Sequence, residues 1–186
     1  MNRRNLLRVA GGALINGALL SAGATLVPAA ATPVARGQAP PRLLSFINTH
    51  TGETFSDAYW EGGAYVPDAL AAINTVMRDH RSGETHAIDT RLLDQLSTLR
   101  AAVESSAPYQ IISGYRSPVT NAALRENSSG VASRSLHMDG RAIDIRVRGV
   151  DTAQLRNAAI AMQAGGVGYY QASDFIHIDT GRVRRW

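Results

Sequence analysis

Two short runs in the second half of the chain alternate apolar and polar residues with the two-residue period of a β-strand. In Ala142–Val147, isoleucine and valine side chains occupy one face, so Asp144 lies on the opposite face. In Phe175–Asp179, two isoleucines face the core, and His177 and Asp179 share the other side. We therefore expect two strands that each present a metal-competent side chain away from the core.

Comparable patterns predict the other elements of a mixed domain. Apolar residues at helical spacing indicate helices, and short runs bounded by turn residues indicate strands. Hairpin-linked strands combined with helices predict a domain of mixed helix and strand content. The predicted helices are Pro67–Arg81, Asp89–Ser105, Ser117–Asn127 and one that starts at Asp151 and is closed by Gly165 and Gly166, and the predicted strands are Tyr109–Ser113, Val167–Tyr170 and a hairpin over Arg42–Trp60.

The first 31 residues have the composition of an export signal. Arg3 and Arg4 precede two leucines, as in a twin-arginine signal, and the apolar stretch that follows ends in an alanine run suited to cleavage. An uncleaved membrane anchor is the alternative, but the stretch is rich in glycine and alanine and only marginally long for a span. We expect an export signal over residues 1–31, a Pro/Ala-rich linker over 32–41 and one periplasmic domain over 42–186, with no stable membrane span after processing.

Charge and cysteine content narrow the class of protein. All 19 basic residues are arginines scattered along the chain, so the formal charge of +4 does not indicate a nucleic-acid-binding surface. Residues 1–31 hold three arginines and no acid, and without them the charge falls from +4 to +1. The chain has no cysteine, which excludes disulfides and a thiolate metal site. Stability must therefore come from an ordinary core, with help from a metal if one binds.

Three residues supply the ligand types that zinc takes. His137 precedes a glycine turn, while Asp144 and His177 project from the polar faces of the two predicted strands. Catalytic zinc sites hold the ion with three such ligands and leave the fourth position to water. Taken singly, each residue also has an ordinary explanation, because a histidine beside a strand can be a core residue and Asp144 can pair with Arg141 or Arg146.

Five short motifs follow one another along the domain before a terminal RRW: NTHTGE (48–53), ISGYRS (112–117), SLHMDGRAID (135–144), GGVGYY (165–170) and FIHIDTG (175–181). In this order they resemble bacterial murein endopeptidases of the zinc superfamily that contains D-Ala-D-Ala metallopeptidases and hedgehog-type domains. The resemblance covers Arg42 to Trp186. It implies one zinc ion per chain on His137, Asp144 and His177. It also implies an α+β fold, with a mainly antiparallel sheet that has helices on one face and a zinc cleft on the other.

The resemblance further implies zinc-dependent hydrolysis of peptide cross-links in peptidoglycan, with peptidoglycan peptides as partners. Arg116, at the end of a predicted strand, can aim a planar pair of donors at a substrate carboxylate or an oxyanion. A salt bridge to a neighbouring acid is the alternative for this residue. Tyr115 and Tyr170 are further candidates for substrate binding, although aromatic residues in strands most often pack.

Two residues are candidates for the general base that such a hydrolysis needs. Asp174 lies three residues before His177, which is the spacing found in related enzymes, and Asp179 lies on the same strand face as His177. We expect Asp174 to be the base and Asp179 to orient the imidazole of His177.

Other functions fit the same motifs. A D,D-carboxypeptidase would use the same metal chemistry to trim a terminal D-alanine. A non-catalytic, zinc-stabilised peptidoglycan-binding module would keep the three ligands without a base, and a purely structural exported protein would bind no zinc.

Overall fold

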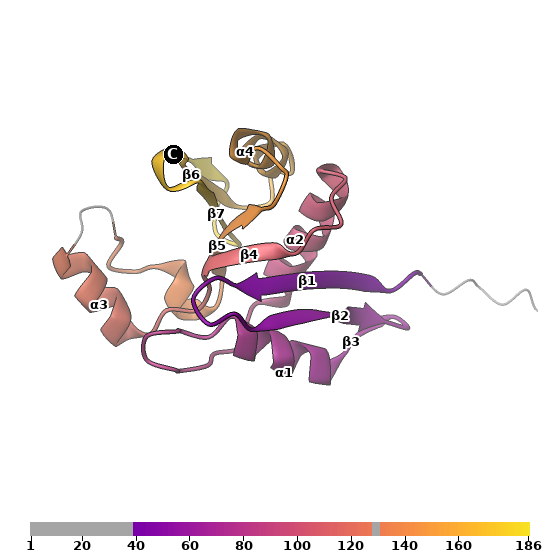
Figure 1. Ribbon diagram of the computed structural model, residues 1–186, viewed down its shortest axis with the longest axis horizontal. Coiled ribbons are helices and arrows are strands. Elements are labelled where there is room, and N and C mark those ends of the chain that lie inside the picture. The colour runs from indigo at the N-terminus through magenta and orange to yellow at the C-terminus, as the bar shows by residue number, and fades with distance from the viewer. Residues whose placement is uncertain (1–38, 128–130) are drawn as a thin grey trace, which may run out of the picture. The chain divides into compact units, whose positions relative to one another are not determined.

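The strands form a single eight-stranded sheet (Figure 1). The computed structural model describes residues 39–127 and 131–186, so the predicted export signal and residues 32–38 of the predicted linker lie outside the described residues. The strands are β1 (Arg42–Asn48), β2 (Thr54–Glu61), β3 (Ala64–Tyr65), β4 (Tyr109–Ser113), β5 (Ala142–Val147), β6 (Gly166–Tyr170), β7 (Phe175–Asp179) and β8 (Arg184–Arg185).

Within the sheet the strands lie in the order β3-β2-β1-β4-β5-β7-β6-β8. The β1–β4 and β6–β8 pairs are parallel, and the other five pairings between described strands are antiparallel. Because β5 pairs with both β4 and β7, it lies near the middle of the sheet, with every ladder hydrogen bond available on both sides.

The described chain has four α-helices, and three of them pack against the sheet. The four are α1 (Pro67–Val76), α2 (Thr90–Ala102), α3 (Pro118–Asn127) and α4 (Thr152–Ala161), with two short 3₁₀ helices, η1 (Leu136–Asp139) and η2 (Gln171–Ser173). Helix α1 contacts β1 and β2, α2 contacts β1, and α4 contacts β5, β6 and β7. Their buried side chains join the inward residues of the strands in one hydrophobic cluster. The α+β fold predicted from the sequence is confirmed.

The predicted helix starts agree with the structure. Helix α1 begins at Pro67 without a side-chain cap, and each of the other three has a side chain that satisfies free backbone N–H groups. Asp89 caps α2 by accepting a hydrogen bond from the N–H of Arg91. Asp151 caps α4 in the same way, with the N–H groups of Ala153 and Gln154 as donors. Ser117 precedes α3, and its Oγ accepts from the N–H of Thr120 at 3.2 Å.

Helix α1 ends at Val76, five residues before the predicted end at Arg81. The carbonyl of Val76 accepts a hydrogen bond from the side-chain amide of Asn48 at 2.9 Å. The carbonyl of Met77 accepts from the N–H of Tyr115 at 2.7 Å. Partners from β1 and from the segment after β4 thus satisfy carbonyls that a longer helix would have used, so tertiary contacts override the local pattern.

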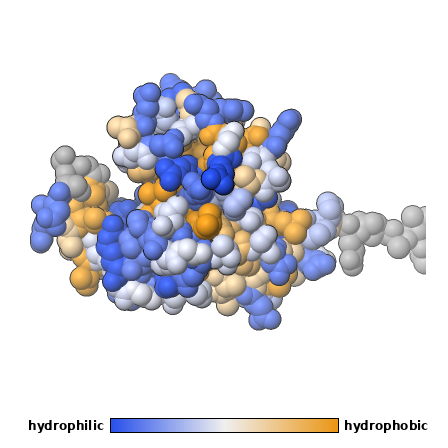
Figure 2. All heavy atoms as spheres, viewed as in Figure 1, coloured by the Kyte–Doolittle hydropathy of each residue, from blue (hydrophilic) through white to orange (hydrophobic). Residues whose placement is uncertain are grey.

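Figure 2 shows hydrophilic side chains over most of the face that it presents, with smaller hydrophobic areas among them. No helix within residues 39–127 and 131–186 has the length and apolar character needed to cross a bilayer.

Candidate metal centre

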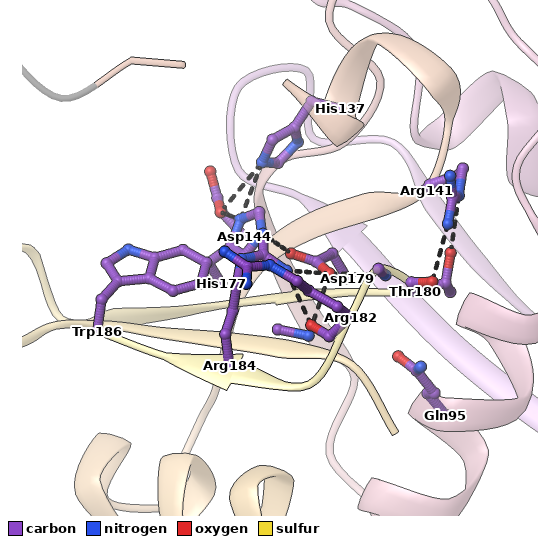
Figure 3. Close-up of polar contacts among 12 residues, drawn as sticks. Gln95, His137, Arg141, Asp144, His177, Asp179, Thr180, Arg182, Arg184 and Trp186 are labelled. Atoms are coloured by element: carbon purple, nitrogen blue, oxygen red, sulfur yellow. Dashed lines mark hydrogen bonds and ion pairs between the residues drawn. The ribbon is translucent and has the colours of Figure 1, made fainter. Parts of the chain in front are cut away.

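Strand register brings two of the three predicted ligands together. Asp144 in β5 is the cross-strand partner of His177 in β7. Their neighbours Ile143, Ile145 and Ile176 are fully buried on the opposite face, which fixes the direction in which the two polar side chains point. His137 comes from η1, and its backbone carbonyl accepts from the N–H of Arg116, so this turn is tied to the end of β4. The three side chains converge, as Figure 3 shows.

The three inward atoms form a tight triangle. Nε2 of His137 lies 3.1 Å from Nδ1 of His177. Oδ1 of Asp144 lies 2.9 Å from that Nδ1 and 3.3 Å from Nε2 of His137. Zinc–nitrogen and zinc–oxygen bonds near 2.0–2.1 Å in a tetrahedral arrangement separate ligand atoms by about 3.3 Å, so this spacing suits zinc. Among the described residues, these three are also the one group of histidines and acids found close enough to share a metal ion.

In each imidazole, the outer nitrogen, which faces away from the ligand triangle, donates a hydrogen bond to another group of the protein. Nδ1 of His137 lies 2.7 Å from the carbonyl oxygen of Gly114, which only accepts. Nε2 of His177 lies 2.9 Å from Oδ2 of Asp179. These partners assign the proton of each neutral ring to the outer nitrogen and leave lone pairs on the two inner nitrogens. Together with the Asp144 carboxylate, they are three electron-pair donors directed at one point, a donor set that fits a cation.

Asp179 is held ionised behind His177. Its carboxylate is fully buried and accepts from both terminal nitrogens of Arg184, at 3.0 and 2.7 Å, and from the N–H groups of Gly166 and Gly181. Burial would raise the pKa of Asp179, but the hydrogen bonds from His177, Arg184 and Gly181 hold it well below its usual range. A Cβ on Gly166 would lie 2.5 Å from the Asp179 carboxylate, so this approach needs glycine. Asp179 is therefore placed to orient the His177 imidazole.

Asp144 is also ionised, and the alternative pairings raised by the sequence are absent. Burial would raise the pKa of Asp144, but the neighbouring His137 and His177 hold it well below its usual range. Arg141 instead bonds Thr180, and Arg146 bonds Gln110. The arginine that faces Asp144 is Arg116, whose Nη2 lies 3.7 Å from Oδ2.

A cavity of about 640 Å³ opens over the three ligands. Arg116, predicted to contact substrate, lines it, with its Nη2 3.2 Å from Oγ of Ser113. The buried Nε of Arg116 has no hydrogen-bond partner within the described chain. Burial lowers the pKa of this guanidinium, and Asp144 opposes that effect. Arg116 is thus a desolvated cation at the cavity wall. Its pairing with Asp144 agrees with the salt-bridge alternative, and its contact with substrate stays a prediction.

Neither candidate base lines the cavity. Asp174 occupies a left-handed backbone conformation between η2 and β7, with φ of 52°. Its carboxylate accepts from the hydroxyl of Thr152 and lies 3.6 Å from Nη1 of Arg146. Asp179 lies behind His177, on the side away from the ligand triangle. This placement argues against the base role expected for Asp174 and agrees with the orienting role expected for Asp179.

The two tyrosines predicted to bind substrate lie in different environments. Tyr170 lines the cavity and is 38% exposed. Tyr115 is buried in the hydrophobic cluster, and its ring stacks on His86 with centroids 4.9 Å apart. The substrate-binding role expected for Tyr115 does not fit this position, because the chain turns at Gly114 and directs the Tyr115 ring toward the loop after α1. The residue that follows it, Arg116, is the one directed at the cavity.

The structure adds residues to the site that the sequence interpretation did not include. Trp186 and Arg184, at the C-terminal end, and Arg134, before η1, line the same cavity. Arg184 and Trp186 reach the cavity because β8 adds to the edge of the sheet beside β6. The terminal RRW was visible as a motif, but a two-residue strand has too short a pattern to predict.

Comparison with known proteins gives a consistent result. Residues 36–186 match a protein family described as peptidoglycan L,D-endopeptidase MepK. The chain is 42% identical over 185 residues to the peptidoglycan L,D-endopeptidase MepK of Escherichia coli strain K12, covering 100% of this chain and 97% of that protein. It is 40% identical over 147 residues to a Haemophilus influenzae protein named "Probable peptidoglycan L,D-endopeptidase MepK", covering 78% of this chain and 79% of that protein.

Proposed function

Because the chain belongs to the peptidoglycan L,D-endopeptidase MepK family, we propose that it is a zinc-dependent endopeptidase that hydrolyses peptide cross-links in peptidoglycan. The bond proposed is the one in the name of its relatives, between an L and a D centre. This function places the protein in the periplasm or elsewhere in the cell envelope, where its substrate lies.

The observation that carries the proposal is the convergence of three lone-pair donors at the floor of an open cavity. His137 Nε2, His177 Nδ1 and Asp144 Oδ1 lie within 3.3 Å of one another and are all buried. A structural zinc site is usually closed by four protein ligands, whereas a catalytic site has three and leaves a position open. Three ligands beneath a cavity of about 640 Å³ therefore favour catalysis over a purely structural metal.

When bound at these ligands, zinc would supply a Lewis acid that lowers the pKa of a coordinated water to about 7 and polarises a carbonyl. The protein residues prepare that chemistry. Gly114 and Asp179 hold the two imidazoles in the tautomers that leave their inner nitrogens free. We propose that Arg116 binds a substrate carboxylate or the developing oxyanion, because its guanidinium is partly desolvated and already faces the cavity.

The cavity wall also favours an anionic peptide as substrate. Arg116, Arg134 and Arg184 line it, and the one acid among its described lining residues is Asp144, whose charge the metal would offset. Peptidoglycan peptides carry free carboxylates, which guanidinium groups bind in a bidentate manner. Arg184 bonds the Asp179 carboxylate at 2.7 Å, whereas Nη2 of Arg116 lies 3.7 Å from Asp144, so Arg116 and Arg134 are less engaged with acids than Arg184 is.

A digest of defined muropeptides tests the proposal. The purified, zinc-loaded protein is incubated with one peptide dimer cross-linked through an L–D bond, a second cross-linked through a D–D bond, and an uncross-linked pentapeptide. Mass spectrometry then identifies the products. We expect cleavage of the L–D cross-link. Release of a terminal D-alanine from the pentapeptide would instead identify a D,D-carboxypeptidase. Binding to all three peptides without any product would identify a non-catalytic module.

A further inference from the structure

We propose that Tyr170 is a catalytic residue that donates a hydrogen bond to the oxyanion formed at the scissile carbonyl, and that the C-terminal Trp186 positions it. This inference rests on the proposed function and adds a named donor to the same site. The phenol keeps its own proton throughout and contributes a hydrogen bond, so no covalent step passes through it.

The direction of one hydrogen bond carries the argument. Nε1 of Trp186 lies 3.1 Å from the phenolic oxygen of Tyr170. An indole N–H can only donate, so the phenolic oxygen of Tyr170 must be the acceptor. The O–H proton of Tyr170 is therefore left for another partner. Within residues 39–127 and 131–186, no acceptor for that proton is found. Because its oxygen accepts from Trp186 and its proton has no acceptor among the described residues, the Tyr170 hydroxyl can donate a hydrogen bond to a bound substrate.

The backbone places Tyr170 on the sheet face that carries the ligand His177. In the β6–β7 ladder, Gly168 lies opposite His177, and Tyr170 lies opposite Phe175. Alternation along both strands puts Tyr170 on the sheet face that carries His177. The Tyr170 ring stacks on Phe175 with centroids 4.6 Å apart and planes 17° apart, which fixes its orientation. Tyr170 lines the cavity together with the three ligands and Arg116.

Arg116 faces the same space. Arg116 and Tyr170 both line the cavity, and Nη2 of Arg116 lies 3.7 Å from Oδ2 of the ligand Asp144. Two donors, the charged one from the loop after β4 and the neutral one from β6, then border the space above the ligands. Paired donors of this kind stabilise a tetrahedral oxyanion more than they stabilise the planar carbonyl.

Trp186 is held firmly enough to position its neighbour. Its backbone N–H bonds the carbonyl of Val167, and its carbonyl accepts from the N–H of Tyr169. The indole lies 5.2 Å from the His177 ring and 4.8 Å from the Arg184 guanidinium, and Figure 3 shows it beside His177. A Cβ on Gly168 would lie 2.7 Å from the indole, so the bare backbone at Gly168 provides the space for this ring.

Tyr170→Phe removes the proposed donor and leaves the ring stack on Phe175. We expect kcat on the L–D cross-linked muropeptide to fall about 100- to 1,000-fold, the loss typical of one oxyanion donor, with KM and zinc content unchanged. The matched control is Tyr169→Phe. Tyr169 is the adjacent residue on the other face of β6, where its ring contacts Arg156 at 4.5 Å. That variant should keep wild-type kcat.

Trp186→Phe keeps an aromatic ring over Gly168 and removes the indole N–H. If Trp186 acts through Tyr170, this change should lower kcat by about tenfold or less in the wild-type background, because it deletes one neutral hydrogen bond. It should have no further effect on kcat in Tyr170→Phe. Equal loss in both backgrounds would overturn the positioning role, because a purely structural tryptophan would affect both alike.

A second readout does not depend on activity. The chain has two tryptophans, Trp60 and Trp186, so the metal-free protein gives two indole N–H resonances in a ¹⁵N NMR spectrum. Tyr170→Phe should shift the Trp186 resonance and leave that of Trp60 unchanged, and Tyr169→Phe should shift neither. No shift in Tyr170→Phe would overturn the hydrogen bond itself.

The two proposals fail in different ways. If the zinc-loaded wild-type protein cleaves no muropeptide, the proposed function is wrong whatever the indole resonance shows. If the wild-type protein cleaves the L–D cross-link and Tyr170→Phe retains kcat within threefold, the oxyanion role of Tyr170 is wrong and the proposed function stands.

Discussion

Asp144 and His177 are cross-strand partners, and the Asp144 carboxylate lies 2.9 Å from Nδ1 of His177. This pairing makes the sheet itself part of the site, because a one-residue slip of either strand would turn its own ligand side chain into the core. The buried isoleucines that alternate with them oppose such a slip. The geometry of the proposed metal centre is therefore fixed by the hydrophobic pattern of its two strands.

Asp179→Asn tests the orienting role of the carboxylate behind His177. The change removes the negative charge that accepts from His177 and Arg184, so we expect zinc affinity to fall about 10- to 100-fold. Stability should fall by about 1–3 kcal/mol, since buried hydrogen bonds are lost. Competition with a chromogenic chelator measures the affinity, and urea denaturation of the metal-free protein measures the stability. Unchanged zinc affinity would contradict the role.

Asp174→Asn tests whether Asp174 is the general base, as its spacing from His177 suggested, or has no part in catalysis, as its position outside the cavity indicates. Asp174 bonds Thr152 and lies near Arg146 on the outside of the cavity, so we expect kcat within about threefold of the wild-type value and unchanged zinc content. A fall of about 100-fold in kcat with zinc retained would restore the base role predicted from the sequence, since general bases contribute about 10²–10⁴ in rate.

Arg116→Lys tests the guanidinium at the cavity wall. Lysine keeps a positive charge near Asp144 and loses the planar pair of donors, so the fold and the zinc content should be retained. We expect kcat to fall about 100-fold. Arg141→Lys is the control, because Arg141 bonds Thr180 outside the cavity and should tolerate the change without loss of kcat. A large drop in the melting temperature of Arg116→Lys would favour a structural salt bridge instead.

The sequence predicts the structure correctly where an element depends on residues that lie close to it in the chain. The strand alternation around Asp144 and His177, and the capping residues Asp89 and Asp151, were sufficient to predict their elements. The same alternation correctly placed Asp179 on the face of His177, where it bonds the imidazole.

The differences arise where distant segments decide the outcome. The end of α1 depends on Asn48 and Tyr115, which meet its last carbonyls from other parts of the chain. The position of Trp186 depends on β8 pairing with β6, which two residues of strand cannot signal in advance. For Asp174, spacing along the chain suggested proximity to the metal, but its left-handed backbone conformation directs the carboxylate toward Thr152.

Asp79→Asn should make the stability of the protein less dependent on acid pH. The buried Asp79 carboxylate accepts from the N–H groups of Ser117 and Arg81, both at 2.9 Å. Burial would raise the pKa of Asp79, but hydrogen bonds from Thr120, Ser117 and Arg81 hold it well below its usual range.

The sign of the effect follows from that lowered pKa. Stabilisation by the ionised form is complete above the unfolded-state pKa of about 3.9 and is lost as the pH falls through the folded-state value. At pH 7 the variant should be less stable by about 1–3 kcal/mol, and the difference should shrink below about pH 4. Urea denaturation from pH 7 to pH 2 measures it. A difference that stays constant over this range would show that Asp79 is not the group responsible.

Reactivation by zinc tests the central claim most directly. The metal-free protein is titrated with zinc while hydrolysis of an L–D cross-linked muropeptide is followed, and His137→Ala serves as the variant that lacks one proposed ligand. We predict no hydrolysis without metal, full activity at one zinc ion per chain, and neither tight zinc binding nor activity in His137→Ala. Hydrolysis by the metal-free protein, or one tightly bound zinc ion per chain in His137→Ala, would contradict the account.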